Sequence, residues 1–481
     1  MGVGARMARS TSSIVAERGA EARGGQPRRL YGLAFGEACD RFAYYGMQSL
    51  LFLYLEATLT APGGGSAIWG LDLVRSLLRA LGERGGPVQV ASTLFGLFTG
   101  AIYLTTLLGG WAADRLLGTR AAAILGGLVA AVGYGLLAVE PTFLVGLALL
   151  AIGSGAFRGN LAAELSSVYA PDDPRRPAGY RFYFFAIMLG VLAAPVVCGG
   201  LAHKLGWRWG FAAGGFGMLC GAGLYLAIGR GRPAPGASRT QEALPASGGW
   251  TWSKAAATAL LLVILAVNLT GAQQLYNAYM AWAEKGLVLR LAGRTLPPTV
   301  LLALDSVLML VALWVVGGLW RVWRRFGREP APPMKIGLGC FCVAAAYVCL
   351  AAIRSPTGPA TYAWVAAFHM LNGLGFAIIN PVALDFLTRS APEGWRSRMA
   401  SLFYLQFAIG SFLAGGLGHL FGQMSTSLFW LVHTGLFGAA GSVALAAGGW
   451  ILRAMEPPGP PSAQAPKPKQ AREPAPEALA A

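Results

Sequence analysis

Charged residues are scarce in this chain. Lys, Arg, Asp and Glu make up only 12% of its 481 residues, whereas a soluble globular chain carries about 25%. The mean hydropathy is +0.54, and the apolar residues form long runs. Runs of about 20 apolar residues are what a helix needs to cross a bilayer core of about 30 Å. The composition excludes an ordinary soluble domain and predicts an all-α membrane protein.

The apolar runs predict twelve membrane-spanning helices in two bundles of six, residues 30–229 and 253–455. The linker between the bundles, 230–252, is rich in Pro, Gly, Ala and Ser. Two six-helix bundles joined in this way resemble the major facilitator fold, with a substrate site between the halves. The predicted spans are residues 31–55, 88–113, 119–139, 142–169, 180–202, 209–229, 253–282, 298–320, 334–353, 361–388, 398–422 and 427–452.

The two ends of the chain are polar. Residues 1–29 lack the short apolar core of a signal peptide, so we expect a disordered cytoplasmic tail there. Residues 456–481 are rich in Pro and Ala and predict a second disordered tail. The chain has 38 Lys and Arg residues against 21 Asp and Glu residues. Most of the Lys and Arg residues lie in the two tails and in the loops on the same side of the membrane. By the positive-inside rule we expect an integral plasma (inner) membrane protein with both termini in the cytoplasm, and no nucleic-acid partner.

Cysteine is also rare. The six cysteines all lie inside predicted spans, and their spacing fits neither a metal site nor a dithiol site. No nucleophile–base pair or phosphate-binding loop stands out. We therefore expect no enzyme activity, no metal and no cofactor. The expected partners are a small-molecule substrate, protons and the lipid bilayer, and the default oligomeric state of this architecture is a monomer.

Three charged residues interrupt the first apolar run. Glu37, Asp40 and Arg41 are spaced three and four residues apart, so they lie on one helix face, which Tyr44 and Tyr45 continue. A charge at the bilayer centre costs about 2.5–3.5 kcal/mol, so the three need partners. The pattern predicts a polar stripe facing a water-filled cavity. A structural ion pair that fixes this helix to a neighbour is the open alternative.

Two loops carry further signals. Residues 109–120, GGWAADRLLGTR, place Asp114, Arg115 and Arg120 where they can form an ion-pair latch on the cytoplasmic face. This stretch resembles the loop signature of major facilitator proteins between helices 2 and 3; an ordinary charged turn is the alternative. In the outer segment 57–87, apolar residues at three- and four-residue spacing predict a short amphipathic surface helix.

Several motifs resemble one family. EACDRFAYYG, residues 37–46, resembles the helix-1 signature ExxERFxYYG of the proton-dependent oligopeptide transporters, with Asp40 in place of the second Glu. IYLTTLLGGWAADRLLG, GSGAFRGN and GWRWGF resemble later segments of the same family, and the resemblance covers residues 33–218 most closely. It implies a divergent member of this family, with the twelve-helix major facilitator fold and proton-coupled import of di- or tripeptides by alternating access.

The resemblance also implies roles for individual residues. Arg41 and Arg158 would hold the peptide carboxylate, for which the planar guanidinium is suited. Glu37 and Asp40 would couple to protons by exchanging salt bridges with these arginines. The implied substrate-binding residues are Arg41, Tyr44, Tyr45, Tyr103, Arg158, Asn160, Gln273 and Phe376.

The chain departs from the family at the opposite end of the expected site. Ala272 and Phe376 stand where the family has carboxylates, and Arg158 replaces a lysine. The alternative function is therefore a major facilitator carrier for a small carboxylate or other anion, with altered or absent proton coupling. A proton-independent facilitator and a transport-inactive sensor also remain open.

Two polar residues of the second half lie in apolar spans. Asp305 stands where the family has an Asn, and a carboxylate is costly to ionise in such a span. We expect it to supply a proton site or to anchor a cationic substrate group, the alternative being an Asp with no transport role. His369 lies two turns before Phe376 and faces the same cavity. It is either a titrating group or a hydrogen-bonded interior residue.

Overall fold

The computed structural model describes residues 26–82, 84–165, 168–169, 173–227, 249–291, 294–327, 329–354, 359–392 and 395–455. Nearly all of the predicted tails, 1–29 and 456–481, and of the predicted linker, 230–252, lies outside the described residues. The predictions for these three segments therefore stay predictions.

Each of the twelve predicted spans coincides with a long helix. Ten of the described helices are long and apolar enough to cross a membrane. Of the other two, α2 carries the three charges noted above, and α14 has a shorter apolar part, Leu402–Gly418. The first half contains α2 (Arg28–Thr60), α4 (Pro87–Ala112), α5 (Thr119–Leu137), α6 (Phe143–Leu165), α7 (Arg176–Leu205) and α8 (Trp207–Ala227). The second half contains α9 (Trp252–Gln274), α11 (Val300–Phe326), α12 (Pro332–Ala351), α13 (Pro359–Arg389), α14 (Arg396–Gly418) and α15 (Thr426–Ala446).

Shorter elements connect these helices. The predicted amphipathic helix is α3, Leu71–Ala80, which buries Leu71 and Leu78. Two predicted spans are not single helices. The helix within 253–282 is interrupted between α9 and α10, and the helix within 427–452 is interrupted between α15 and α16. A small hairpin was not predicted. The remaining short elements are α10 (Ala278–Gly286), α16 (Gly448–Met455), η1 (Ala113–Leu117), η2 (Glu140–Thr142), β1 (Arg290–Leu291) and the antiparallel β2 (Arg294–Thr295).

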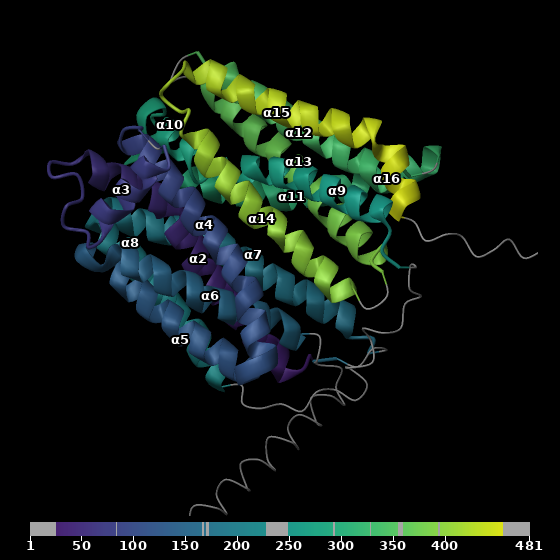
Figure 1. Ribbon diagram of the computed structural model, residues 1–481, viewed down its shortest axis with the longest axis horizontal. Coiled ribbons are helices and arrows are strands. Elements are labelled where there is room, and N and C mark those ends of the chain that lie inside the picture. Colours follow the sequence, from purple (N-terminus) through teal and green to yellow (C-terminus); the bar gives the residue numbers. More distant parts are fainter. Residues whose placement is uncertain are drawn as a thin grey trace, which may run out of the picture.

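The helices form two bundles that lie side by side (Figure 1). In the first bundle α2 packs against α7 and α8, and α5 packs against α6. In the second bundle α12 packs against α13 and α15, and α9 packs against α14. Contacts between the bundles are made chiefly by α4 with α14 and by α7 with α11. The short helix α10 of the second half also contacts α2 of the first.

The two halves are in tight contact at the end of the molecule near α3 and α10. Ser92 on α4 donates a hydrogen bond to the carbonyl of Gly415 on α14, 3.0 Å away. Asn277, in the break between α9 and α10, donates to Ser92 Oγ over 2.8 Å. Gly96 and Gly415 bring the two backbones together, since a Cβ on Gly96 would lie 2.6 Å from the Cα of Gly415. Small residues, together with an ion pair between Glu56 of α2 and Lys285 of α10, therefore close this end.

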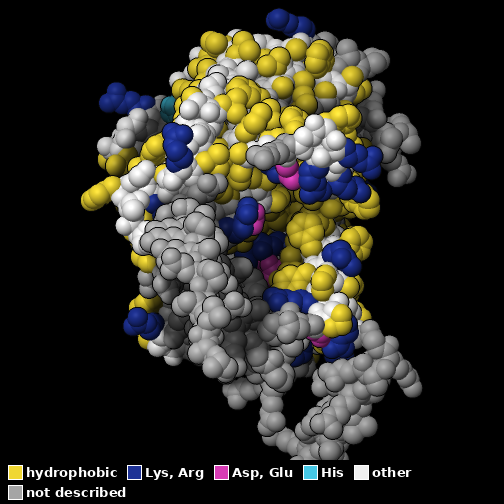
Figure 2. All heavy atoms as spheres, turned by 90° about the vertical axis from the view of Figure 1, so that its right-hand side faces the viewer, with side chains coloured by type: hydrophobic (Ala, Val, Ile, Leu, Met, Phe, Trp, Pro, Cys, Tyr) yellow, Lys and Arg dark blue, Asp and Glu magenta, His cyan; other side chains and the backbone are white. Residues whose placement is uncertain are grey.

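The opposite end, toward α16, is hollowed between the halves (Figure 2). Lys, Arg, Asp and Glu side chains lie in this hollow, between surfaces that are mostly hydrophobic. The described conformation is thus closed at the α3 end and open at the α16 end. With the predicted topology, the open end would face the cytoplasm.

The glycine contact generates a test of this closure. In Gly415→Ala the new Cβ would lie 2.9 Å from the Cα of Gly96, so α4 and α14 must separate. Overpacking of this kind costs about 1–3 kcal/mol, so the closed state should become less populated. Spin-label distances across the α3 end should lengthen or broaden. Gly416→Ala is the matched control, because nothing lies within 4 Å of its Cβ, and equal effects of the two variants would contradict the role of the contact.

Candidate functional site

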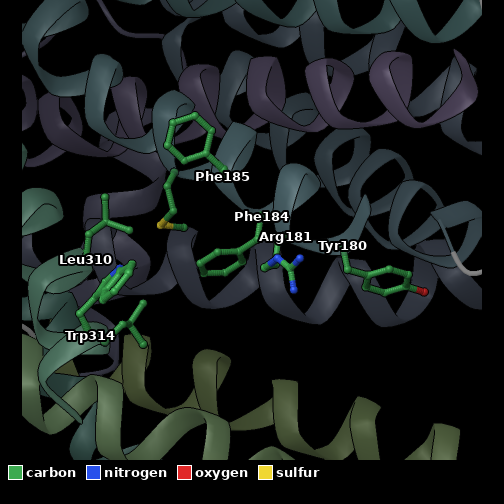
Figure 3. Close-up of a pocket in the computed structure, with 8 residues that line it drawn as sticks. Tyr180, Arg181, Phe184, Phe185, Leu310 and Trp314 are labelled. Atoms are coloured by element: carbon green, nitrogen blue, oxygen red, sulfur yellow. The ribbon is translucent and has the colours of Figure 1, made fainter. Parts of the chain in front are cut away.

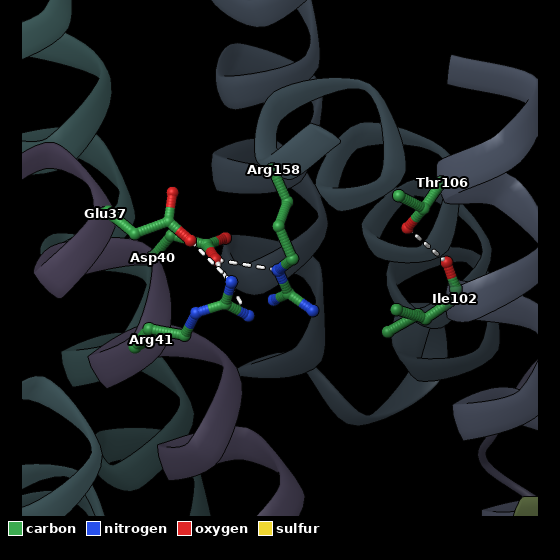
Figure 4. A network of polar contacts seen from close by, with 6 residues as sticks. All are labelled: Glu37, Asp40, Arg41, Ile102, Thr106 and Arg158. Carbon is green, nitrogen blue, oxygen red and sulfur yellow. Dashed lines mark hydrogen bonds and ion pairs between the residues drawn. The ribbon is translucent and has the colours of Figure 1, made fainter. Parts of the chain in front are cut away.

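The charged residues of α2 form a buried cluster with α6. Arg41 Nη2 lies 2.5 Å from Glu37 Oε1, and Arg158 Nε lies 2.9 Å from Asp40 Oδ2 (Figure 4). Arg41 Nη1 also lies 4.0 Å from Asp40 Oδ2. The two carboxylates are at most 1% exposed, whereas the Arg41 side chain is 21% exposed. The three charged residues therefore lie together, with Arg41 the most exposed of them, and the pair of Asp40 and Arg158 joins α2 to α6, as in the structural alternative. That the stripe faces a water-filled cavity stays a prediction.

Close helix packing holds this stretch of α2 in place. A Cβ on Gly190 of α7 would lie 2.2 Å from the carbonyl oxygen of Ala38. A Cβ on Gly221 of α8 would lie 3.0 Å from the carbonyl oxygen of Gly36. Backbone contacts on both sides of α2 fix its rotation, so Glu37 and Asp40 point toward α6 rather than toward lipid.

Several polar atoms of the cluster have no hydrogen-bond partner among the described residues. Nη1 and Nη2 of Arg158 are buried in this state, as are Glu37 Oε2 and Asp40 Oδ1. A buried donor left unpaired costs about 1–3 kcal/mol, and more for a charged group. The free edge of the Arg158 guanidinium is therefore a prepared site for an oxygen ligand.

Aromatic side chains extend from this cluster toward the other half. The Arg158 guanidinium carbon lies 4.4 Å from the centre of the Tyr44 ring. Tyr44 contacts Tyr45 at 5.2 Å between ring centres, and Tyr45 reaches Tyr276 at 6.0 Å. Because Tyr276 follows α9, this aromatic row crosses from the first half to the second. Tyr103 on α4 likewise reaches the other half, 5.0 Å from Phe407 of α14.

In the second half Asp305 and His369 are in direct contact. His369 Nδ1 lies 2.8 Å from Asp305 Oδ1, and His369 Nε2 lies 2.9 Å from the Tyr279 hydroxyl. The histidine is fully buried, whereas the Asp305 side chain is 16% exposed. On the other side, the Tyr279 ring stacks on Phe368 at 5.2 Å between ring centres, so the pair lies among aromatic side chains of the second half.

Other residues predicted to bind substrate have partners inside the protein. Gln273 accepts a hydrogen bond from Gln48 over 2.8 Å, which joins α9 to α2. Asn160 is buried and donates to the carbonyl of Ala156, one turn earlier. Phe376 is half-buried on α13. For these residues substrate contact stays a prediction.

Only part of the ion-pair latch predicted from Asp114, Arg115 and Arg120 lies within the described residues. Arg120 donates to the carbonyls of Tyr225 and Leu226, each over 3.3 Å, and so caps the end of α8. Its guanidinium also lies 5.1 Å from the centre of the Tyr225 ring. Arg115 is exposed in the π-helical turn η1, and the side chain of Asp114 lies outside the described residues. An ion pair between Asp114 and either arginine stays a prediction.

An apolar groove lies between α7 and α11, where the halves meet (Figure 3). Its volume is about 430 Å³, and Phe184 and Met188 of α7 line it opposite Leu310 and Trp314 of α11. Neither the two carboxylates nor the two arginines of the charged cluster line it, so the cluster and the groove are different surfaces.

Tyr276 and Tyr279 are functional candidates that the sequence analysis missed. Both lie in QLYNAY, where α9 ends and α10 begins, and a continuous span gave no reason to select them. The break is stabilised by Gln274 and Asn277, whose side-chain amides donate to the carbonyl of Ala414. A run of polar residues inside an apolar span is the signal that would have indicated the break.

Comparisons with known proteins agree with this geometry. The sequence profile of the Major Facilitator Superfamily matches residues 34–415. An uncharacterized transporter of Bacillus subtilis, YclF, is 24% identical, covering 89% of this chain and 93% of that protein. A di-/tripeptide transporter of Lactococcus lactis subsp. cremoris is 24% identical, covering 86% and 93%. A crystal structure of a peptide transporter in complex with sulfate superposes with a TM-score of 0.75 at 22% identity, covering 90% and 96%. The expected resemblance to peptide transporters is confirmed.

The ion pair between Asp40 and Arg158 can be tested by its effect on stability. Arg158→Gln leaves a buried carboxylate unpaired, so it should lower the free energy of unfolding by about 3–5 kcal/mol. Adding Asp40→Asn should recover part of this loss, as measured by thermal unfolding of the purified protein. The exposed pair of Arg389 and Asp385, 2.7 Å apart, is the control, and Arg389→Gln should cost at most about 1 kcal/mol. Equal losses at both pairs would contradict the buried role.

Proposed function

The chain belongs to the Major Facilitator Superfamily, and we propose that it is a proton-coupled symporter that imports di- or tripeptides or related small solutes by alternating access. The family consists of membrane transporters, not enzymes. The peptide transporters among its relatives favour a peptide-like substrate. Alternating access requires the closed α3 end to open while the α16 end closes, so that the site between the halves faces each side in turn.

The observation that carries this proposal is the free guanidinium edge of Arg158 beside Arg41. Asp40 occupies Nε of Arg158, while Nη1 and Nη2 have no hydrogen-bond partner among the described residues. A carboxylate binds two parallel N–H groups of one guanidinium, so a peptide C-terminus fits this edge. Arg41 adds a second, accessible positive charge.

The charge of the α2–α6 cluster supplies a reason for proton coupling. Glu37 and Asp40 balance Arg41 and Arg158, so the empty cluster has no net charge. A bound substrate carboxylate adds one negative charge in a place where net charge is costly. A proton on Glu37 or Asp40 neutralises this added charge, so the carboxylate and the proton would bind together. With a zwitterionic peptide, whose own net charge is zero, the proton is one net positive charge moving inward, which gains about 2.3 kcal/mol per 100 mV of membrane potential.

The second half provides a group of opposite charge for the amino end of a peptide. Asp305 is partly exposed and lies in the second half, which the row of Tyr44, Tyr45 and Tyr276, starting at Arg158, reaches at Tyr276. We infer that the substrate lies along these rings, with its carboxylate at the arginines and its ammonium group at Asp305.

The alternative is a carrier for a small carboxylate or other anion. It is favoured by Ala272 and Phe376, which place no charge where carboxylates were expected. In this case Arg41 and Arg158 alone would select the substrate, and proton coupling would be altered or absent. For either function we propose a monomer in the plasma (inner) membrane with both termini in the cytoplasm.

Uptake into proteoliposomes distinguishes the two functions. With an inward proton gradient and a panel of dipeptides and small anions, we expect dipeptides to accumulate above the level reached without the gradient. Simple anions that accumulate alone would support the alternative. Gradient-independent equilibration of dipeptides would contradict proton coupling, and no uptake of either class would contradict both functions.

The role of the guanidinium edge is tested by Arg158→Lys. Lysine keeps the charge beside Asp40 but cannot bind a carboxylate bidentately. The preference for a dipeptide over its C-terminal amide should fall roughly 10- to 100-fold, as two charge-assisted hydrogen bonds are worth about 1.5–3 kcal/mol. Arg389→Lys, on the exposed end of α13, should leave the preference unchanged. An unchanged preference in Arg158→Lys would contradict the proposed contact.

A further inference from the structure

The contacts of His369 determine where its proton lies. An ionised carboxylate only accepts hydrogen bonds, so the nitrogen facing Asp305, Nδ1, must carry a proton. In the neutral imidazole Nε2 is then an acceptor, which the Tyr279 hydroxyl satisfies by donating to it. The three residues come from α11, α13 and α10. For a neutral His369, both contacts fit the tautomer that carries its proton on Nδ1.

The net charge of the pair formed by Asp305 and His369 differs from that of the α2–α6 cluster in the first half. Neutral His369 with ionised Asp305 carries one negative charge, whereas the α2–α6 cluster is balanced. The titratable groups around the pair are Tyr279 of α10, Tyr276 of the turn before it, and Tyr347 of α12, which stacks on His433 of α15. None of these groups brings a positive charge at neutral pH when His433 is unprotonated. The pair therefore needs a cation.

Two cations have access to it. Asp305 is the exposed member of the pair, so the ammonium group of a substrate can reach its free oxygen. A proton can instead pass through Asp305 to the buried His369, which turns the pair into a neutral ion pair. Either event leaves the pair of Asp305 and His369, with its bound cation, without net charge.

We propose that Asp305 and His369 form one charge site that is neutralised either by the cationic group of the substrate or by one proton. Neutralisation by a substrate group rests on the proposed function, whereas neutralisation by a proton does not. It follows that a substrate without an amino group must bring one more proton than its zwitterionic counterpart. The same carrier would then accept both peptides and simple carboxylates, with different proton numbers.

Calorimetry in two buffers of different ionisation enthalpy measures the protons taken up on binding. For the wild-type protein we expect about one more proton with N-acetyl-alanylalanine than with alanylalanine. Asp305→Asn retains the acceptor for His369 Nδ1 but removes the charge, so the difference should disappear. His433→Gln is the control, since this buried histidine bonds to the carbonyl of Phe429 rather than to a carboxylate, and it should keep the difference. Equal proton numbers for the two ligands in the wild type would overturn the proposal.

A second measurement needs no substrate. The chain has four histidines, so ¹⁵N spectra of histidine-labelled protein can be assigned to His369 by loss of its signal in His369→Gln. We expect the His369 signal to report a proton on Nδ1 in the wild type and to change in Asp305→Asn, because the carboxylate that it faces is lost. Identical His369 signals in the two proteins would overturn the pairing. If neither dipeptide binds but this change is present, the proposed substrate is wrong and the charge site stands.

Discussion

The need to compensate every buried charge inside the membrane shapes the rest of this structure. Glu37 and Asp40 are almost completely buried, and each is within hydrogen-bond distance of an arginine. Removing one partner would leave a charge in a low-dielectric interior, which is strongly destabilising. Asp40 and Arg158 therefore tie α2 to α6 as firmly as their packing does, and they fix the rotation of the helix that carries Arg41 and Tyr44.

The same constraint gives the two halves different chemistry. With its four groups ionised, the α2–α6 cluster is balanced and would become negative on binding a carboxylate, whereas the pair of Asp305 and a neutral His369 would be negative before it binds a cation. A zwitterionic solute with a proton would satisfy both sites at once. The aromatic row between them carries no charge, so it can line a path for substrates of different side chains without changing this balance.

Conformational change depends on contacts of another kind. At the α3 end the halves meet through small and uncharged residues, Gly96, Gly415, Ser92 and Asn277, and through an ion pair between Glu56 of α2 and the largely exposed Lys285 of α10. An exposed pair of this kind separates at lower cost than a buried one. The salt bridges that hold α2 to α6 lie within one half, so a movement of the halves against each other would leave them intact.

The sequence by itself determined the class of the protein, the twelve apolar helices, their division into halves and the stripe from Glu37 to Tyr45. These features follow from composition and from spacing along one helix, which are local properties. Asp305 and His369 were each recognised as polar residues in apolar spans, but they are 64 positions apart and their contact was not predicted. Only the tertiary structure decided that they meet, because the packing of α11 against α13 sets the distance between them.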